Sequence, residues 1–243
     1  MLILAIDTTS QQGGAAIYRD RECLAELAND SPANRSSVTL FQMMHRLVAE
    51  VQARLAVPSF SLRDIDLFAV ATGPGSFTGI RVGVAAAQGW ARAFERPACG
   101  VTVLEAMVAQ AQPEAEYAVP ILDAHRGEFY LAVFRRAASE DGGAFEAVSE
   151  GRVLKPEALA PFLAEQLPDG ASAVCLTREN DQAALALRGA LPQTLGWQAV
   201  PGTLVEGITR RALEAHRNGK LQTPAELDAY YLRRTDAELN WRG

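Results

Sequence analysis

The sequence predicts an α/β fold built from two related lobes, and three features indicate it. An apolar run at residues 67–71 enters a glycine-rich loop and continues as a helical pattern, the order of strand, loop and helix. The N-terminal residues alternate apolar runs with polar turns, as in a β-meander. A strand that ends in an aspartate and turns into another strand occurs twice, which favours a duplicated lobe. We place the lobes at residues 1–100 and 101–243, each with a central mixed sheet.

The first lobe opens with three predicted strands and a helix. Residues 2–6 form the first strand and lead into the turn Asp7-Thr8-Thr9-Ser10, and residues 15–18 and 23–27 follow as strands. A helix is predicted over residues 40–55, because apolar residues recur there at helical spacing. Its apolar face consists of Leu40, Met44, Leu47, Val48, Val51 and Leu55.

A loop rich in glycine follows the strand at residues 67–71. It comprises Gly73, Pro74, Gly75, Ser76, Phe77, Thr78 and Gly79. A phosphate-binding P-loop needs a lysine after the glycines, and none is present here. A dinucleotide-binding loop fits loosely, but no acidic residue ends the next apparent strand, at residues 98–103, to bind a ribose. A tight strand-to-helix turn with Ser76 or Thr78 as N-cap explains the pattern as well, so these interpretations stay open.

The helix after this loop has a stripe of very small residues. Gly79, Gly83 and Ala87 are four positions apart, so another element can approach closely along that stripe. A glycine inside a helix costs about 1 kcal/mol relative to alanine, and close packing would compensate for that cost at Gly83. The packing partner is either another protein or the rest of this chain, and the sequence leaves both open.

The second lobe is predicted to repeat the design of strand, turn and strand. Residues 118–122 form a strand that reaches Asp123, and residues 129–134 form the returning strand. The remaining predicted elements are helices at 101–112, 156–166 and 202–217 and a strand at 173–176. We expect the final segment of this lobe to pack back onto the first lobe.

Composition narrows the classes of function. With 243 residues, 49% of them apolar, the chain is large enough for a substantial core, and its net charge of −6 argues against strong independent binding to nucleic acid. Its three cysteines, Cys23, Cys99 and Cys175, are far apart and in apolar contexts, which favours free thiols. No stretch has the length and composition of a membrane span, so we expect a cytoplasmic protein without membrane contact.

These motifs together resemble the TsaB and TsaD family of bacterial tRNA threonylcarbamoyladenosine (t6A) biosynthesis, and specifically its TsaB (YeaZ) branch. The resemblance depends on residues 3–8 and 73–83, on Asp123-Ala124 with Gly127-Glu128, and on Tyr231-Leu232-Arg233. It covers nearly the whole chain, and the loop at 73–79 is its most specific part. The resemblance implies the two-lobed fold of actin, sugar kinases and heat-shock ATPases, in agreement with the suspected duplication.

The resemblance also shows where this chain departs from nucleotide-binding and catalytic members. Active members hold phosphates with a loop of the type Asp-x-Gly-Thr/Ser, whereas Thr9 stands at the glycine position here and the second loop, at Asp123, also lacks the glycine. TsaD-like members carry a His-x-x-x-His pair for a metal, whereas His45, His125 and His216 are far apart. We therefore expect no metal and no catalytic residues. A cofactor is expected only as ATP or ADP at a subunit junction.

Two functions follow as hypotheses. In the first, the chain is a non-catalytic subunit, an inactive homologue of TsaD, and it binds a TsaD-like catalytic subunit through Leu40, Met44, Leu47, Gly79, Gly83 and Ala87. A TsaE-like ATPase completes that assembly, tRNA is bound only within it, and the same helices pair in a homodimer when the chain is alone. In the second, the chain is an ATP-dependent phosphotransferase or a metallopeptidase, with Asp7 and Asp123 as candidate carboxylates.

The basic residues near the C-terminus are a further candidate contact for tRNA phosphates. They are Arg210, Arg211, Arg217, Lys220, Arg233, Arg234 and Arg242. Ion pairs with the abundant acidic residues and solvated helix faces explain them equally well, and we favour that interpretation.

Overall fold

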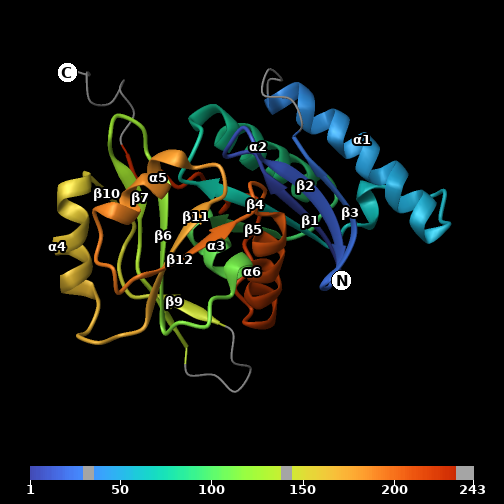
Figure 1. Ribbon diagram of the computed structural model, residues 1–243. Coiled ribbons are helices and arrows are strands. Elements are labelled where there is room, and N and C mark those ends of the chain that lie inside the picture. Colours follow the sequence, from blue (N-terminus) through green and yellow to red (C-terminus); the bar gives the residue numbers. More distant parts are fainter. Residues whose placement is uncertain (30–35, 138–143, 234–243) are drawn as a thin grey trace. The chain divides into compact units, whose positions relative to one another are not determined.

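The computed structural model describes residues 1–29, 36–137 and 144–233 (Figure 1). The chain forms two compact units. The first contains Met1–Ala111 and Pro201–Ala229, and the second contains Gln112–Val200 and continues from Tyr230. Each unit holds a mixed sheet with helices packed against it, so the predicted α/β fold class is confirmed.

The first unit is built on a sheet of five strands in the order β3-β2-β1-β4-β5. Strands β1, β2 and β3 form the predicted antiparallel meander, and β4 and β5 extend the sheet parallel to β1. The strands are β1 (Leu2–Asp7), β2 (Gly14–Arg19), β3 (Glu22–Ala28), β4 (Leu67–Gly73) and β5 (Ala98–Thr102). The helices are α1 (Ser36–Leu55), η1 (Leu62–Asp64), α2 (Phe77–Ala93), α3 (Val103–Ala111) and α6 (Val205–Arg217).

Helices α1 and α2 cover one face of this sheet (Figure 1). Helices α3 and α6 pack against each other and against the strands. The core under α1 and α2 contains alternate residues of the strands, because successive side chains of a strand point to opposite faces. On β1 these are Leu4 and Ile6, and on β4 they are Phe68 and Val70. The predicted amphipathic helix therefore exists and buries its apolar face here.

The division into units differs from the one predicted after residue 100, because α3 packs directly on α6. A Cβ added at Gly207 would lie 2.1 Å from the backbone oxygen of Ala106, so only glycine allows this approach. The side chain of Gln110 accepts a hydrogen bond from Gly207 N (2.9 Å) and donates one to Thr203 O (3.3 Å). Helix α6 therefore belongs to the first unit, although 89 residues of the second unit precede Pro201 in the chain.

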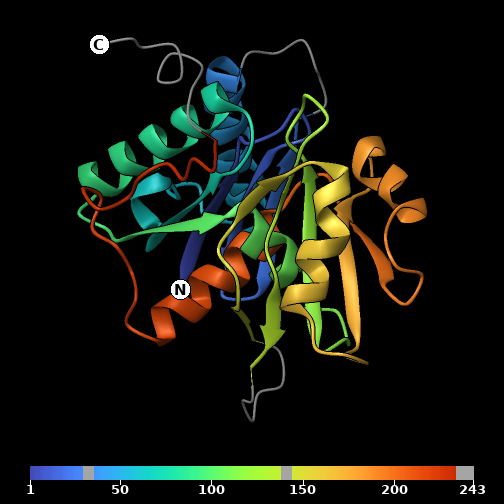
Figure 2. The same cartoon turned by 90° about the vertical axis from the view of Figure 1, so that its left-hand side faces the viewer.

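The segment after α6 stays in the first unit as far as Ala229. Gln222 exchanges two backbone hydrogen bonds with Ala98 and so covers the outer edge of β5. Leu227 is 1% exposed within the core, and its carbonyl accepts a hydrogen bond from the Gln88 side chain of α2 (2.6 Å). Figure 2 shows this red segment running along α2.

The second unit has seven strands, with the order β10-β7-β6-β11-β12 and with β8 paired to β6 and β9. Its strands are β6 (Tyr117–Asp123), β7 (Phe129–Leu131), β8 (Phe134–Arg136), β9 (Phe145–Ala147), β10 (Arg152–Leu154), β11 (Ala173–Arg178) and β12 (Gly196–Val200). Its helices are α4 (Pro156–Gln166), α5 (Gln182–Ala186) and η2 (Leu187–Gly189). The single returning strand predicted at residues 129–134 is in fact β7 and the start of β8, which pair with different parts of β6.

Candidate functional site

The glycine-rich loop is a tight turn between β4 and α2. Gly73 and Gly75 have φ angles of 120° and 157°, in the region that favours glycine. Ser76 is the N-cap of α2, and its side-chain oxygen accepts a hydrogen bond from Gly79 N at 3.2 Å. Of the three interpretations of this loop, the strand-to-helix turn with Ser76 as N-cap is confirmed.

This loop also lies directly on the turn between β1 and β2. Ser76 N donates to Thr9 O (2.7 Å), and Thr8 Oγ1 donates to Gly79 O (2.7 Å). A Cβ at Gly75 would lie 2.5 Å from Thr9 O, and one at Gly79 would lie 1.9 Å from Thr8 O. The glycines of the loop are therefore required so that its backbone can contact the backbone of the β1–β2 turn.

The stripe of small residues on α2 faces this turn and β4. A Cβ at Gly83 would lie 2.3 Å from Thr8 Oγ1 and 3.2 Å from a methyl group of Val70. Gly79 and Ala87 are likewise buried. The stripe therefore serves packing within the chain, which was the second of the two possibilities that the sequence left open.

The structure corrects the expected partner-binding surface. Leu40, Met44 and Leu47 of α1 are 1%, 4% and 0% exposed, and together with the buried stripe of α2 they face the core of the first unit. The six residues named from the sequence are thus unavailable on the surface of the chain as it stands. The exposed residues of these two helices lie on their opposite sides.

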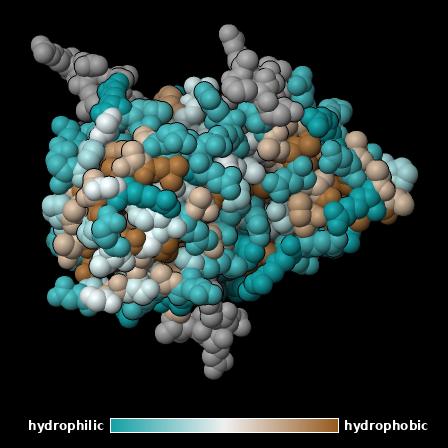
Figure 3. Space-filling model, viewed as in Figure 1, coloured by the Kyte–Doolittle hydropathy of each residue, from teal (hydrophilic) through white to brown (hydrophobic). Residues whose placement is uncertain are grey.

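We call that opposite side the outer face of α1 and α2. It contains two exposed aromatic residues, Phe41 (59% exposed) and Phe77 (39% exposed). The ring of Phe41 meets Trp90 edge to face at a centroid distance of 6.0 Å, and the Arg81 guanidinium lies 3.8 Å from the centroid of the Phe77 ring. In Figure 3, brown and tan residues lie among polar ones over the region of α1.

Gly89 is the second distinctive feature of the outer face. It is exposed within α2, and an added Cβ there would meet no atom within 4 Å. Among the described residues, no close packing at this position therefore compensates for the cost of a glycine inside the helix. Sequence reasoning missed both Phe41 and Gly89. The available signal was that neither residue fits the apolar or small stripe of its own helix.

The turn after β1 is built from the chain's own polar groups. Asp7 Oδ1 accepts hydrogen bonds from Thr9 N (3.0 Å) and Thr9 Oγ1 (2.6 Å), and all three residues from Asp7 to Thr9 are buried. Ser10, half-buried, accepts a hydrogen bond from Gly13 N through its carbonyl (3.2 Å). Since the Thr9 side chain occupies the glycine position and Asp7 binds its N–H, this turn does not fit a nucleotide phosphate.

The turn after β6 has the same design. Asp123 Oδ1 accepts from His125 N (2.7 Å), and its other oxygen lies 3.2 Å from His125 Nδ1. The backbone N–H of Asp123 donates to Asp181 (2.8 Å). In both units the aspartate that ends the strand thus accepts a hydrogen bond from the backbone two residues later, which is a local turn-capping role.

No group of three potential metal-ligating side chains occurs among residues 1–29, 36–137 and 144–233. No helix in the same ranges has both the length and the apolar character that crossing a bilayer requires.

The basic residues near the C-terminus are partly ion-paired. Arg211 lies 3.1 Å from Glu105 and also pairs with Glu214, and Arg233 pairs with Glu128. Arg234 and Arg242 lie outside the described residues.

The three cysteines are free thiols in the structure, as the sequence predicted. Burial raises the pKa of the Cys99 thiol and of the Cys175 thiol to about 12, and it also raises the pKa of the half-buried Cys23. Because the thiolate is the nucleophile, we expect a thiol reagent at pH 8 to modify Cys23 first and to spare Cys99 and Cys175 until the chain unfolds. Mass spectrometry of the native and urea-unfolded protein measures this order.

The same pKa shifts predict a loss of stability in alkali. Each of these two thiols ionises near pH 9 in the unfolded chain and near pH 12 in the folded chain. Between pH 9 and pH 12, ionisation of the thiol therefore stabilises the unfolded chain relative to the folded one. The free energy of unfolding should therefore fall as the pH rises through this window. Urea denaturation at pH 8 and pH 10 tests the sign, with Cys99→Ala as the variant in which one contribution is removed.

Comparisons with known proteins identify relatives of this chain by sequence and by fold. Residues 36–168 match the family model of TsaD, tRNA N6-adenosine threonylcarbamoyltransferase. The chain is 35% identical over 161 residues to the tRNA threonylcarbamoyladenosine biosynthesis protein TsaB of Escherichia coli, a match that covers 65% of the chain and 64% of that relative. It is 32% identical over 135 residues to TsaB of Bacillus subtilis, with 56% of each chain covered. The match thus spans less than two thirds of either relative.

The fold agrees with these sequence matches. The structure of YeaZ from Pseudomonas aeruginosa superimposes with a TM-score of 0.74 over 95% of this chain and 99% of that one, at 23% identity. The family model covers more than half of the chain, and the curated relatives and the similar structure are named TsaB and YeaZ. The chain therefore belongs to the TsaD family, and its resemblance to TsaB (YeaZ) proteins is confirmed.

Proposed function

We propose that this chain is a non-catalytic subunit in the biosynthesis of t6A in tRNA, and that it binds a TsaD-like catalytic subunit. The observation that carries the proposal is that Asp7 and Asp123, the carboxylates best placed by sequence for chemistry, are used to cap their own turns. The names of the relatives, tRNA threonylcarbamoyladenosine biosynthesis protein TsaB, support the pathway.

The proposal assigns the chemistry to the partner. The TsaD-like subunit holds the metal and transfers the threonylcarbamoyl group from threonylcarbamoyl-AMP to adenosine in tRNA. A TsaE-like ATPase completes the assembly, and tRNA is bound by the complex rather than by this acidic chain alone. Any ATP or ADP is bound at a subunit junction, because the turns after β1 and β6 do not have the open glycine backbone that a phosphate requires.

The outer face of α1 and α2 is the proposed docking surface. Exposed aromatic side chains are typical anchors of protein interfaces, and Phe41 and Phe77 lie on this face. Gly89 leaves room for a partner helix to approach the backbone of α2 closely. When the catalytic subunit is absent, two copies of the chain pair through the same face.

The complex is tested by placing a large side chain at Gly89. Because an added Cβ at this residue meets nothing within 4 Å, Gly89→Arg should fold normally and yet weaken binding of the catalytic subunit by about 100-fold or more, as a buried, unpaired charge at an interface does. The matched control is Gly189→Arg, at a position in the second unit that is equally open. Calorimetric titration with the co-purified catalytic subunit measures both affinities.

If Gly89→Arg binds the catalytic subunit as tightly as the Gly189→Arg control, this docking surface is wrong. Phe41→Ala offers an independent test on the other helix, and its expected loss is about tenfold or more, the size found for aromatic anchors. The enzyme hypotheses are tested separately. Stoichiometric binding of ATP with magnesium to the isolated chain, accompanied by turnover, would contradict the proposed non-catalytic role.

A further inference from the structure

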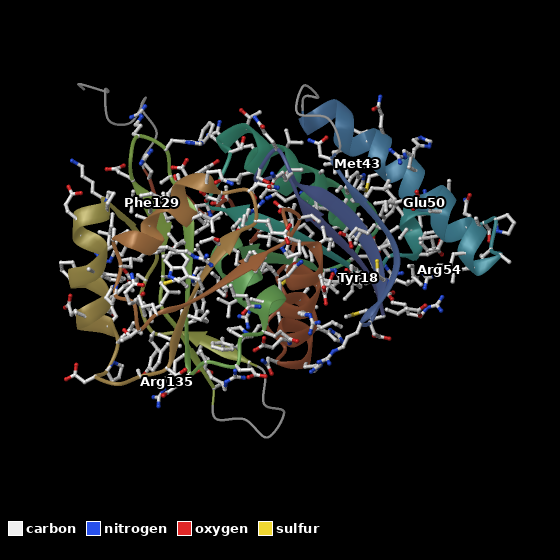
Figure 4. The ribbon with its side chains drawn as sticks, viewed as in Figure 1. Tyr18, Met43, Glu50, Arg54, Phe129 and Arg135 are labelled. Atoms are coloured by element: carbon white, nitrogen blue, oxygen red, sulfur yellow. The ribbon has the colours of Figure 1, made fainter. Side chains whose placement is uncertain are left out.

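Arg54 connects the last turn of α1 to the edge of the sheet. Its Nη1 donates to the backbone oxygens of Cys23 (2.8 Å) and Leu24 (3.1 Å), and its Nη2 lies 2.9 Å from Glu22 Oε1. All three acceptors belong to β3, the outermost strand of the first unit. Figure 4 shows Arg54 on the side of α1 toward the β2–β3 hairpin, which also carries Tyr18.

The two backbone oxygens are available together because β3 is irregular at this point. Tyr18 of β2 pairs with Cys23, whereas its neighbour Ile17 pairs with Ala25, so Leu24 is an extra residue in β3. In a regular strand, consecutive carbonyl groups point in opposite directions. The bulge at Leu24 breaks that alternation and brings both oxygens within reach of one guanidinium nitrogen.

This contact differs in kind from the rest of the interface between α1 and the sheet. Elsewhere along α1, buried apolar side chains such as Met43, Leu47 and Val51 pack into the core of the first unit. The hydrophobic effect that drives this packing is not directional. Hydrogen bonds to two fixed carbonyl oxygens are directional and define where the C-terminal end of α1 lies.

We propose that Arg54 is a positioning residue, which fixes the C-terminal end of α1 on β3 and thereby holds the outer face of α1 and α2 in the arrangement that the catalytic subunit recognises. The inference rests on the proposed function for its consequence, but its structural part concerns this chain alone. Arg54 need not touch the partner. It acts through the position of α1.

The test compares Arg54→Met with Arg46→Met. Both positions are exposed arginines of α1, and Arg46 lies eight residues before Arg54. Arg46→Met therefore removes the same charge from the helix while the hydrogen bonds from Arg54 to β3 stay in place. Hydrogen exchange of the isolated chain should be faster in the last turn of α1 and around Leu24 in Arg54→Met, and unchanged in Arg46→Met. Equal exchange in the two variants overturns the inference, whether or not a catalytic subunit binds.

Affinity for the catalytic subunit gives the functional readout at a temperature where every variant is folded. Arg54→Met should weaken binding by about tenfold, the effect of losing hydrogen bonds to a charged group. Glu22→Gln keeps the two carbonyl contacts and should stay within about twofold, and Arg54→Lys, which keeps a charged donor, should recover part of the affinity. Faster exchange with unchanged affinity would overturn the link to partner binding. If the wild-type chain binds no catalytic subunit, the proposed function fails, and the exchange experiment still decides the role of Arg54.

Discussion

Gly79→Ala should lower the free energy of unfolding by about 3 kcal/mol or more, the upper range for forcing extra atoms into packed structure. The added Cβ would lie 1.9 Å from Thr8 O and 3.0 Å from Thr8 C, which are backbone atoms and cannot move aside as a side chain can. The substitution must therefore separate α2 from the β1–β2 turn, and it breaks the hydrogen bond between Thr8 Oγ1 and Gly79 O. Urea denaturation followed by circular dichroism measures the change.

Gly89→Ala is the matched control, because it makes the same chemical change nearly three helical turns later. No atom lies within 4 Å of its added Cβ, so it should raise the free energy of unfolding by about 0.5–1 kcal/mol through helix propensity alone. Opposite signs for the two variants are expected. A neutral Gly79→Ala would mean that the close approach of the loop to Thr8 does not contribute to stability.

Asp7→Ala should cost about 2–3 kcal/mol of stability, because it removes the acceptor of buried hydrogen-bond donors. Asp7 Oδ1 receives hydrogen bonds from both Thr9 N and Thr9 Oγ1, and Asp7 is 1% exposed. Without the carboxylate both donors lose this acceptor inside a buried turn. Thermal denaturation of the variant and of the wild-type chain measures the loss.

Asp7→Asn separates this capping role from catalysis. The amide oxygen of asparagine accepts the same hydrogen bonds, so the variant should recover most of the stability. It should also support t6A formation at the wild-type level when it is combined with the catalytic subunit, the ATPase and tRNA. A stable Asp7→Asn chain that binds the catalytic subunit but abolishes t6A formation would show that the carboxylate takes part in the reaction, in favour of an enzymatic role.

Much of the fold could be read from local patterns. The β-meander and the amphipathic helix α1 are encoded in the spacing of apolar residues, and the turn from β4 to α2 is encoded in its glycines and Ser76. The repeated aspartate at a strand end was also visible, and the structure gives both copies the same hydrogen bond to the second following residue. These features depend on neighbours within a few residues, which is the range over which sequence patterns are informative.

The placement of surfaces required the tertiary structure. The small stripe of α2 was equally consistent with a partner and with the chain's own β1–β2 turn, because a glycine specifies close approach but not what approaches. Only the structure shows that Thr8 fills the space beside Gly79 and Gly83 while the space beside Gly89 is open. The six residues expected at a partner surface are buried in the first unit, and which helices meet a partner stays a prediction.

The sequence by itself determined the class of fold and the family resemblance. It also showed that both turns, at Thr9 and at Asp123-Ala124-His125, depart from the Asp-x-Gly-Thr/Ser pattern. The tertiary structure alone decided that α6 joins the first unit, that the loop at 73–79 packs on the β1–β2 turn, and that Arg54 holds β3. The physical reason is that these contacts join residues about 30 to 100 positions apart. Local preferences fix each element, but only packing of distant elements fixes which sides of them meet.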